Sequence, residues 1–363
     1  MYILEIYRLD PSDGSFNLVD IIETYIGLRF NLALNNVGQI LFDLNGFDPK
    51  SQSSNLVRYR THIAVKDTDT DLVLWFGCVN HVGGSVSLGS DNSINTSISV
   101  GGATFLEHFK TRFIESAVNY SQQEQIEIAW DLIDTAQSKT NGELGVTEGA
   151  NPASGQLRDR KFENQNIAEA LVNLTNVING FDFDFTPSLD SDNYVDGVVF
   201  NTYYPSLGTL RTDLPVLRLN ENIATFSLVT TSELINTVFA EGAGTGSPIT
   251  SSYSNTSLQL GYTRREEFLA KKDISIQSTL DEKTQKFVSE NGVEVLEVNL
   301  ELMPGTIPAL TDLNLGDRLR IDLGLTGGSD YFGTQGWGKV TEINVEIDEN
   351  GSAVISPRLE IIR

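Results

Sequence analysis

The feature that most constrains the fold is an abrupt change of hydrophobic period at Asn179-Gly180. Before this dipeptide, apolar residues fall at i, i+4, i+7 and i+11, the spacing of one face of a helix: Ile167, Leu171, Leu174 and Ile178. After it, three phenylalanines alternate with two aspartates over residues 181–185, which is the period of a strand. A helix that leads at once into a strand predicts an α+β unit in which the two elements share a core.

The ends of this helix carry their own signals. Asn166 and Glu169 suit the N-cap and N3 positions, and Gly180 suits the left-handed position after the last turn. On the strand, the phenylalanines are expected to face the core. Asp182 and Asp184 then share the opposite face, about 7 Å apart. We expect that face to be solvated or to meet another subunit, rather than to hold a catalytic carboxylate pair.

Two further helices are expected upstream. Residues 103–118 place Phe105, Phe109 and Phe113 on one helical stripe. Residues 121–142 begin with Ser121 and Glu124 in capping-box spacing and end at Asn141-Gly142. Their apolar stripe is Ile126, Trp130 and Ile133.

The rest of the chain is expected to form strands, with turn signals every 8 to 12 residues that are typical of a sandwich or barrel. Hairpin tips are predicted at 68–71 and 89–92, a turn at 190–197, and type I′ hairpin turns at Asn291-Gly292 and Asn350-Gly351. Residues 235–260 are expected to be a strand and a long loop, and residues 315–325 another strand. The predicted domains are 1–100 (β), 101–235 (α+β with about three helices) and 236–363 (β), and they can be interleaved.

Composition limits the function. The chain holds 25 Lys and Arg against 49 Asp and Glu, a formal net charge of −24, which argues against gripping nucleic acid or an anionic membrane. Its single cysteine allows no intrachain disulfide. We find no secretory signal and no apolar run of membrane-spanning length, so we expect folding in a reducing cytoplasm.

No motif for chemistry is complete. Cys78 and His81 lie three apart, which in a strand places them on opposite faces. Residues 241–247 lack the Gly-Lys-Ser/Thr end of a phosphate loop. The aspartates at 67, 69 and 71 fit an EF-hand, but Leu72 and Cys78 stand where Gly and Glu are needed. The sequence therefore predicts no catalytic, cofactor-binding or metal site, and it leaves weak calcium binding by the 67–71 and 190–196 turns open.

The succession of elements from about residue 100 to 363 resembles the baseplate or tail hub (minor tail) proteins of long-tailed bacteriophages. The resemblance rests on an R-x-R-x-F segment at Arg158, Arg160 and Phe162, and on the helix exit from Asn179 to Phe183. A strand running into a Gly-rich loop follows at 236–246. The segments "RREEFLAKKDIS" and "LGDRLRI" complete the order.

The resemblance implies a mainly β fold with an α+β middle, built of tube-forming β-barrel domains. It further implies a non-enzymatic virion protein, assembled in the host cytoplasm. This protein would be a homotrimer that closes the distal end of the tail tube. Its partners would be the distal tail protein ring, the tape-measure protein and tip or fibre proteins. An acidic lumen would let DNA pass without binding it, because like charges repel.

Two other functions stay open. A carbohydrate- or receptor-binding β module would need an exposed aromatic platform, for which Trp75 and Trp337 are the candidates. A glycosidase would need two carboxylates in a cleft. The basic groups at 158–161, 264–265 and 271–272 are expected at subunit contacts or on solvated turns.

Overall fold

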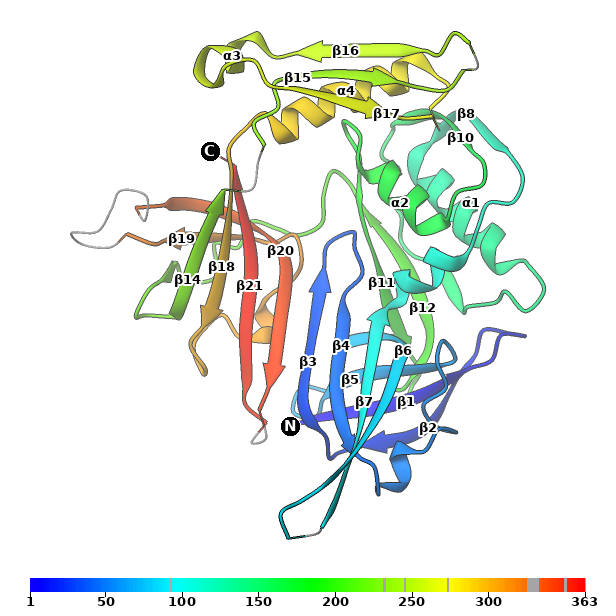
Figure 1. The fold of residues 1–363 in the computed structure, drawn as a ribbon, viewed down its shortest axis with the longest axis vertical. Coiled ribbons are helices and arrows are strands. Elements are labelled where there is room, and N and C mark those ends of the chain that lie inside the picture. Colours follow the sequence, from blue (N-terminus) through cyan, green and yellow to red (C-terminus); the bar gives the residue numbers. More distant parts are fainter. Residues whose placement is uncertain are drawn as a thin grey trace.

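The structure of the chain is a computed structural model that describes residues 1–91, 93–230, 233–244, 246–272, 274–324, 333–348 and 351–362. The fold is mainly β, as predicted, with an α+β middle. A wide sheet, antiparallel except for one short parallel pair, occupies one side, a helical layer packs beside part of it, and a smaller sheet with one long helix lies across the top in Figure 1.

The wide sheet joins thirteen described strands in the order β14-β18-β21-β20-β3-β4-β7-β6-β5-β1-β2, with β19 attached to β20 and β13 to β19. Its N-terminal strands are β1 (Tyr2–Leu9), β2 (Phe16–Ile22), β3 (Ile26–Ala33), β4 (Gln39–Asn45), β5 (Thr61–Asp67), β6 (Leu72–Leu88) and β7 (Ile94–Thr104). Its later strands are β13 (Leu217–Arg218), β14 (Ile223–Thr230), β18 (Val295–Leu302), β19 (Arg318–Asp322), β20 (Gln335–Ile347) and β21 (Ala353–Ile362). Short 3-10 turns are η1 (Pro49–Ser51) and η3 (Leu310–Asp312).

One strand pair connects the two ends of the chain. β20 pairs antiparallel with β3, from Glu342 opposite Ala33 to Ile347 opposite Leu28. We call this pairing the seam. A single hydrophobic core runs under it and includes Leu28 and Phe30 from one half and Ile343 and Val345 from the other. No pairing closes the sheet among the described strands, so the predicted barrel closure stays a prediction, as do the predicted domain boundaries at 100 and 235.

The middle layer contains the predicted helices, with changed limits. It consists of η2 (Phe105–Thr111), β8 (Val118–Glu124), α1 (Gln125–Gln137), β9 (Val146–Glu148), β10 (Leu157–Phe162), α2 (Ile167–Thr175), β11 (Asp182–Leu189) and β12 (Val195–Tyr203). The stripe predicted for 103–118 was wrong in length, because Phe105 and Phe109 are buried in a 3-10 turn while Phe113 is about half exposed. The predicted cap at Ser121 was also wrong, since Ser121 lies in β8 and the carboxylate of Glu124 caps α1.

The helix α2 begins with the predicted N-cap, but the residue with positive φ between α2 and β11 is not the predicted one. Asn166 accepts a hydrogen bond from the backbone of Glu169, which confirms the N-cap. Asn179, with φ of 56°, takes the left-handed conformation expected of Gly180. Gly180 is needed for space instead, because a Cβ there would lie 2.1 Å from the carbonyl oxygen of Thr175.

The upper layer was partly missed from the sequence. It consists of β15 (Thr237–Glu241), β16 (Thr250–Ser254), α3 (Thr256–Tyr262), β17 (Glu266–Ala270) and α4 (Gln277–Asn291). The loop expected after Glu241 is thus interrupted by a strand and a helix. The turn predicted at Asn291-Gly292 was wrong: Asn291 ends α4, and Gly292 caps it with φ of −87°. Gly351 has φ of 79° between paired strands β20 and β21, which confirms that hairpin, while Asn350 lies outside the described residues.

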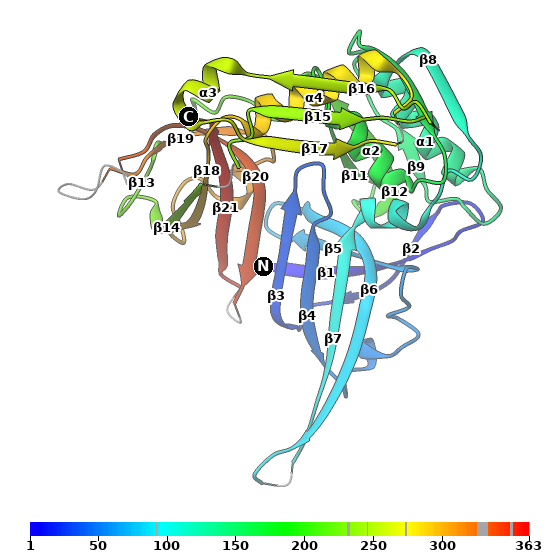
Figure 2. The ribbon, with the colours of Figure 1, turned by 45° about the horizontal axis from the view of Figure 1, so that its top comes forward.

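The other predicted hairpins, and the turn predicted at 190–197, are confirmed. β5 pairs with β6, β6 with β7, and β11 with β12. The β6–β7 pair extends well beyond its neighbours and projects from the body as a two-stranded ribbon in both ribbon views (Figures 1 and 2).

Candidate functional site

One face of the wide sheet forms a mainly polar surface across the seam, and we call it the seam face. Side chains alternate along each strand, so one face of β14, β18, β21, β20, β3, β4, β7 and β6 is mainly apolar and packs on the core, and the other is mainly polar. A groove of about 690 Å³ lies on the polar side. It is lined by residues of both halves, including Arg29, Gln39, His81, Glu301, Asn344 and Glu346.

Polar side chains hold the seam face together. Asn31 on β3 donates to the carboxylate of Glu342 on β20 at 2.7 Å, and Arg358 on β21 reaches the same carboxylate at 3.0 Å. The amide oxygen of Asn31 also accepts from the backbone of Gln39 at 2.6 Å. These contacts link β4, β3, β20 and β21 side by side. Two strands that are more than 300 residues apart in the chain are thereby fixed in register.

Carboxylates outnumber cations on this face. The eight strands present six carboxylates against three cations, namely Asp43, Glu297, Glu301, Glu342, Glu346 and Glu360 against Arg29, Lys339 and Arg358. At one end β19 adds Arg318, Arg320 and Asp322. The excess of carboxylates on these eight strands gives the seam face a negative charge, which repels other anions.

Asp182 connects three parts of the fold. Its side chain was expected on a solvated or inter-subunit face, and this was wrong, because Asp182 is only 8% exposed. Its carboxylate accepts from Asn35 Nδ2 at 2.6 Å, from the backbone of Leu207 at 2.9 Å and from Lys339 Nζ at 3.1 Å. These donors come from the β3–β4 turn, from the segment after β12 and from β20. Asp182 therefore fixes the middle layer to both sides of the seam.

Asp184 has a separate environment. It accepts from the side chains of Asn201 and Tyr203, and burial raises the pKa of its carboxyl. Phe185 packs on Phe105 and Phe109 of η2, and Phe183 packs on Phe185 and Phe200, as expected of the core side of this strand. Asp182 and Asp184 are thus bound to different protein donors and do not form a catalytic pair.

The other candidate residues have structural partners. Asp71 pairs with Lys66 at 2.8 Å, and Asp69 with the N-terminal amine at 3.0 Å. Asp190 accepts backbone hydrogen bonds within its own turn. Among the described residues, no group of three or more His, Cys, Asp or Glu side chains is placed to hold a metal ion.

Cysteine and tryptophan give no site either. Cys78 is fully buried, and burial raises the pKa of its thiol to about 12, whereas His81 is exposed on the seam face. Trp75 is buried in the core and Trp337 is 37% exposed, so the two do not form an exposed aromatic platform.

No helix of the described chain is both long and apolar enough to cross a membrane.

The R-x-R-x-F segment is an internal anchor. Arg158, Arg160 and Phe162 are all buried, at alternate positions of β10. Arg158 donates to Glu282 of α4 at 2.5 Å and to the carbonyl of Ile178 at 2.7 Å. This arginine was expected at a subunit contact or on a solvated turn, and instead it ties the upper layer to the α2–β11 joint. Arg264 and Lys272 also pair within the chain, each with an acidic residue of the upper layer.

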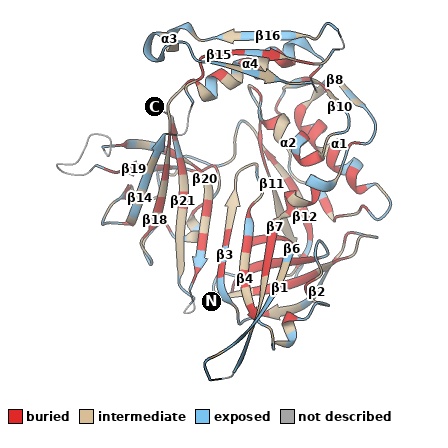
Figure 3. Cartoon of the chain, viewed as in Figure 1, coloured by how far each residue is buried: buried red, intermediate tan, exposed pale blue. Residues whose placement is uncertain are grey.

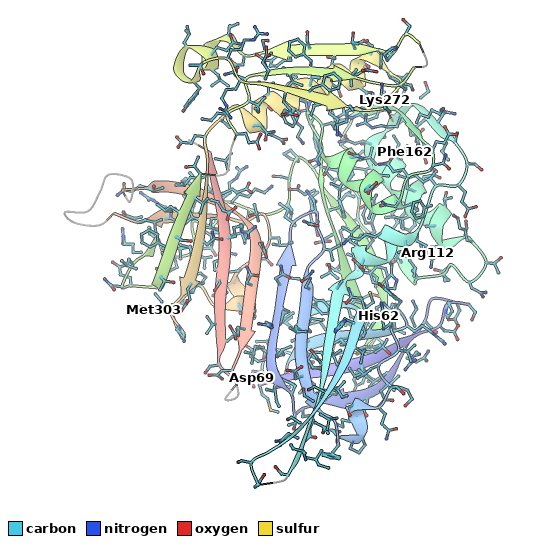
Figure 4. All side chains as sticks on the ribbon, viewed as in Figure 1. His62, Asp69, Arg112, Phe162, Lys272 and Met303 are labelled. Atoms are coloured by element: carbon cyan, nitrogen blue, oxygen red, sulfur yellow. The ribbon has the colours of Figure 1, made fainter. Side chains whose placement is uncertain are left out.

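A buried pair of histidines was not predicted from the sequence. Figure 4 shows His62 inside the N-terminal strands. Its Nε2 lies 2.8 Å from Nε2 of His108 on η2, and both rings pack on Phe105. Burial lowers the pKa of both imidazoles, that of His108 to about 4. The pair joins the sheet to the middle layer, and 46 residues separate its members, so no local spacing could reveal it.

Solved structures with a similar fold are known. The fold is that of phage tail proteins, as the sequence resemblance predicted. The tail protein from Neisseria meningitidis aligns with a TM-score of 0.60 and 12% identity over 99% of this chain and 96% of that one. The 43 kDa tail protein of prophage MuSo2 from Shewanella oneidensis gives 0.58 and 10% over 98% and 97%.

A third similar structure comes from a secretion machine. The E. coli c3393 protein is described as a type VI secretion component with structural similarity to the T4 tail proteins gp27 and gp5. It aligns with a TM-score of 0.51 and 10% identity over 94% of this chain and 74% of its own. No family model and no curated protein matches the chain.

Proposed function

We propose that this chain is a structural tail hub of a phage-like particle, a trimer that closes the distal end of a tail tube, with the seam face toward the lumen. The observation that carries the proposal is the seam face itself. It runs without interruption across both halves of the sheet, it is mainly polar with a few apolar side chains such as Leu41, Val229 and Val354, and its eight strands carry six carboxylates against three cations. The similarity to tail proteins over almost the whole chain supports it.

A continuous sheet is a suitable wall for a tube. Each chain offers two sheet halves joined at the seam, so three chains would supply six halves around an axis. The carboxylates would repel the phosphates of passing DNA, and the cross-strand bonds of Asn31, Glu342 and Arg358 would keep the wall from opening. The role needs no catalytic step, and we propose none.

Further partners follow from the proposed position in the tail. We propose a ring of distal tail protein on one side, the tape-measure protein within the tube, and tip or fibre proteins beyond it. The location would be the virion, after assembly in the host cytoplasm. The alternative of a carbohydrate- or receptor-binding module is less well supported, because Trp75 is buried and Trp337, at 37% exposed, does not form an aromatic platform with it.

Mass measurement tests the assembly. Light scattering of the purified chain is expected to give three times its mass of 39.9 kDa, and a larger complex when a distal tail protein is added. A strict monomer that ignores that protein at micromolar concentrations would contradict the hub assignment.

Charge reversal tests the lumen. Replacing Asp43, Glu346 and Glu360 by lysine changes the charge of the seam face by six units per chain. The wild-type chain is expected not to retard double-stranded DNA at low salt, whereas the variant is expected to bind it in a salt-dependent way. The control places three lysines on exposed acidic positions away from this face: Asp13, Asp134 and Asp192. Equal DNA binding by both variants would mean that only the net charge of the chain matters, and it would contradict a lumen position for the seam face.

A further inference from the structure

The ribbon formed by the distal parts of β6 and β7 has one apolar face. β5 pairs with β6 only as far as Cys78, and β4 pairs with β7 only as far as Ser97, so the ribbon continues without neighbouring strands in the described chain. Its cross-strand pairs alternate in character. One face carries Val82, Gly84, Val86, Leu88, Ile94, Thr96 and Ile98 and is mainly aliphatic, and the other carries Gly83, Ser85, Ser87, Asn95, Ser97 and Ser99.

The apolar face continues from the core into solvent. Val82 and Ile98 still pack against the main core, whereas Val86 and Leu88 are each 74% exposed and Ile94 is 56% exposed. Figure 3 shows the outer ribbon as exposed. A two-stranded ribbon is marginally stable in water by itself, and aliphatic side chains gathered on one face favour contact with another surface.

The charge of the ribbon indicates what that surface belongs to. Residues 72–106 contain one ionised side chain, Asp91, in a chain with a net charge of −24 and 20% charged residues. Like charges juxtaposed at a contact cost free energy, so two copies of so acidic a chain associate most readily through a surface that excludes carboxylates. The ribbon is an exposed surface that meets this condition, which favours a second copy of the same chain as its partner.

The chain also offers an apolar groove for such a partner. It has a volume of about 480 Å³ and lies on the core side of the seam, between β6, β11 and the η3 turn. Its lining is mostly apolar and includes Leu72, Leu74, Pro187, Leu310 and Leu315. Leu72 is 50% exposed. Asp184 is the only ionisable carboxyl in the lining, and it is hydrogen-bonded to Asn201 and Tyr203.

We propose that the apolar face of the β6–β7 ribbon of one copy docks in this groove of the next copy. The two surfaces differ, so the contact is head-to-tail rather than two-fold, and in the proposed trimer three such contacts close a ring. This inference rests on the proposed hub function and names the contact that holds the ring together.

A double substitution on the ribbon tests the docking. Val86→Asp with Leu88→Asp places two carboxylates on the docking face and is expected to weaken self-association by about 100-fold or more, since two buried aliphatic side chains are lost. The matched control, Ser85→Asp with Ser87→Asp, adds the same charge to the opposite face and is expected to keep the trimer. Light scattering over a concentration series measures both, and far-UV circular dichroism checks that each variant is folded.

Cross-linking tests the geometry. Leu72 and Leu88 lie at opposite ends of β6, about 50 Å apart by strand rise, far beyond the reach of a disulfide within one chain. Oxidation of a Leu72→Cys, Leu88→Cys variant is therefore expected to give covalent trimers, whereas Leu72→Cys with Ser87→Cys should not. Buried Cys78 is not expected to react.

The outcomes separate the two proposals. A wild-type trimer that both aspartate pairs leave intact, or that fails to cross-link, overturns the ribbon contact and keeps the hub function. A wild-type monomer overturns both. Cross-linked dimers of a Leu88→Cys single variant would show ribbon-to-ribbon pairing and also overturn docking in the groove.

Discussion

Removal of the Asp182 carboxylate is expected to weaken the fold more than removal of any exposed aspartate. The carboxylate is buried and accepts three hydrogen bonds, from Asn35, Leu207 and Lys339. A buried donor that loses its acceptor costs about 1–3 kcal/mol, and a broken buried ion pair costs about 3–5 kcal/mol. Because the Lys339 side chain is 28% exposed, it regains water, which lowers the total.

We therefore expect Asp182→Ala to lower the free energy of unfolding by about 3 kcal/mol. Asp182→Asn keeps the size and can still accept from one or two donors, so its cost should be about 1 kcal/mol. Asp192→Ala is the control, since Asp192 lies exposed in the turn of the same β11–β12 hairpin and should change stability by less than about 0.5 kcal/mol.

Urea unfolding followed by tryptophan fluorescence measures all three variants. If the free energies of unfolding of Asp182→Ala and Asp192→Ala differ by less than about 1 kcal/mol, the three hydrogen bonds of Asp182 do not hold the layers together. A double-mutant cycle with Lys339→Met then isolates the ion pair between Asp182 and Lys339. A coupling energy below about 0.5 kcal/mol would mean that Asp182 stabilises the fold only through its hydrogen bonds with Asn35 and the backbone of Leu207.

Two further predictions concern the joint and the histidine pair. Gly180→Ala is expected to destabilise the fold by more than about 2 kcal/mol, the cost of a forced backbone shift, because the new Cβ would meet the carbonyl of Thr175. Asn179→Gly is the control and should be nearly neutral, because Asn179 already has the positive φ that glycine adopts easily. Thermal melts measure both variants. The pKa of His62 and His108 is lowered in the folded state, so the unfolded state binds more protons in acid, and stability should be intact above about pH 6.5 and fall as the pH drops toward 4. His108 alone accounts for a loss on the order of 3 kcal/mol, and a His108→Phe variant that keeps the same acid dependence of urea unfolding would refute this source.

Local sequence predicted the elements whose cause is local. The N-cap at Asn166, the phenylalanine side of β11 and the confirmed hairpins each depend on residues within a few positions of one another. Predictions failed where tertiary packing overrode a local signal. Asn291-Gly292 has the composition of a hairpin turn, but α4 is held on the middle layer through Glu282 and Thr279, so the chain stays helical up to that point.

The sequence by itself determined the class of fold, the excess of negative charge and the joint at Asn179-Gly180, because periodicity, composition and backbone preference are properties of neighbouring residues. Only the tertiary structure decided what Asp182 does. Its donors Asn35 and Lys339 are about 150 residues away in either direction, and no spacing encodes such a contact. The same holds for the seam between β3 and β20, whose register arises only when the two ends of the chain meet over a common core.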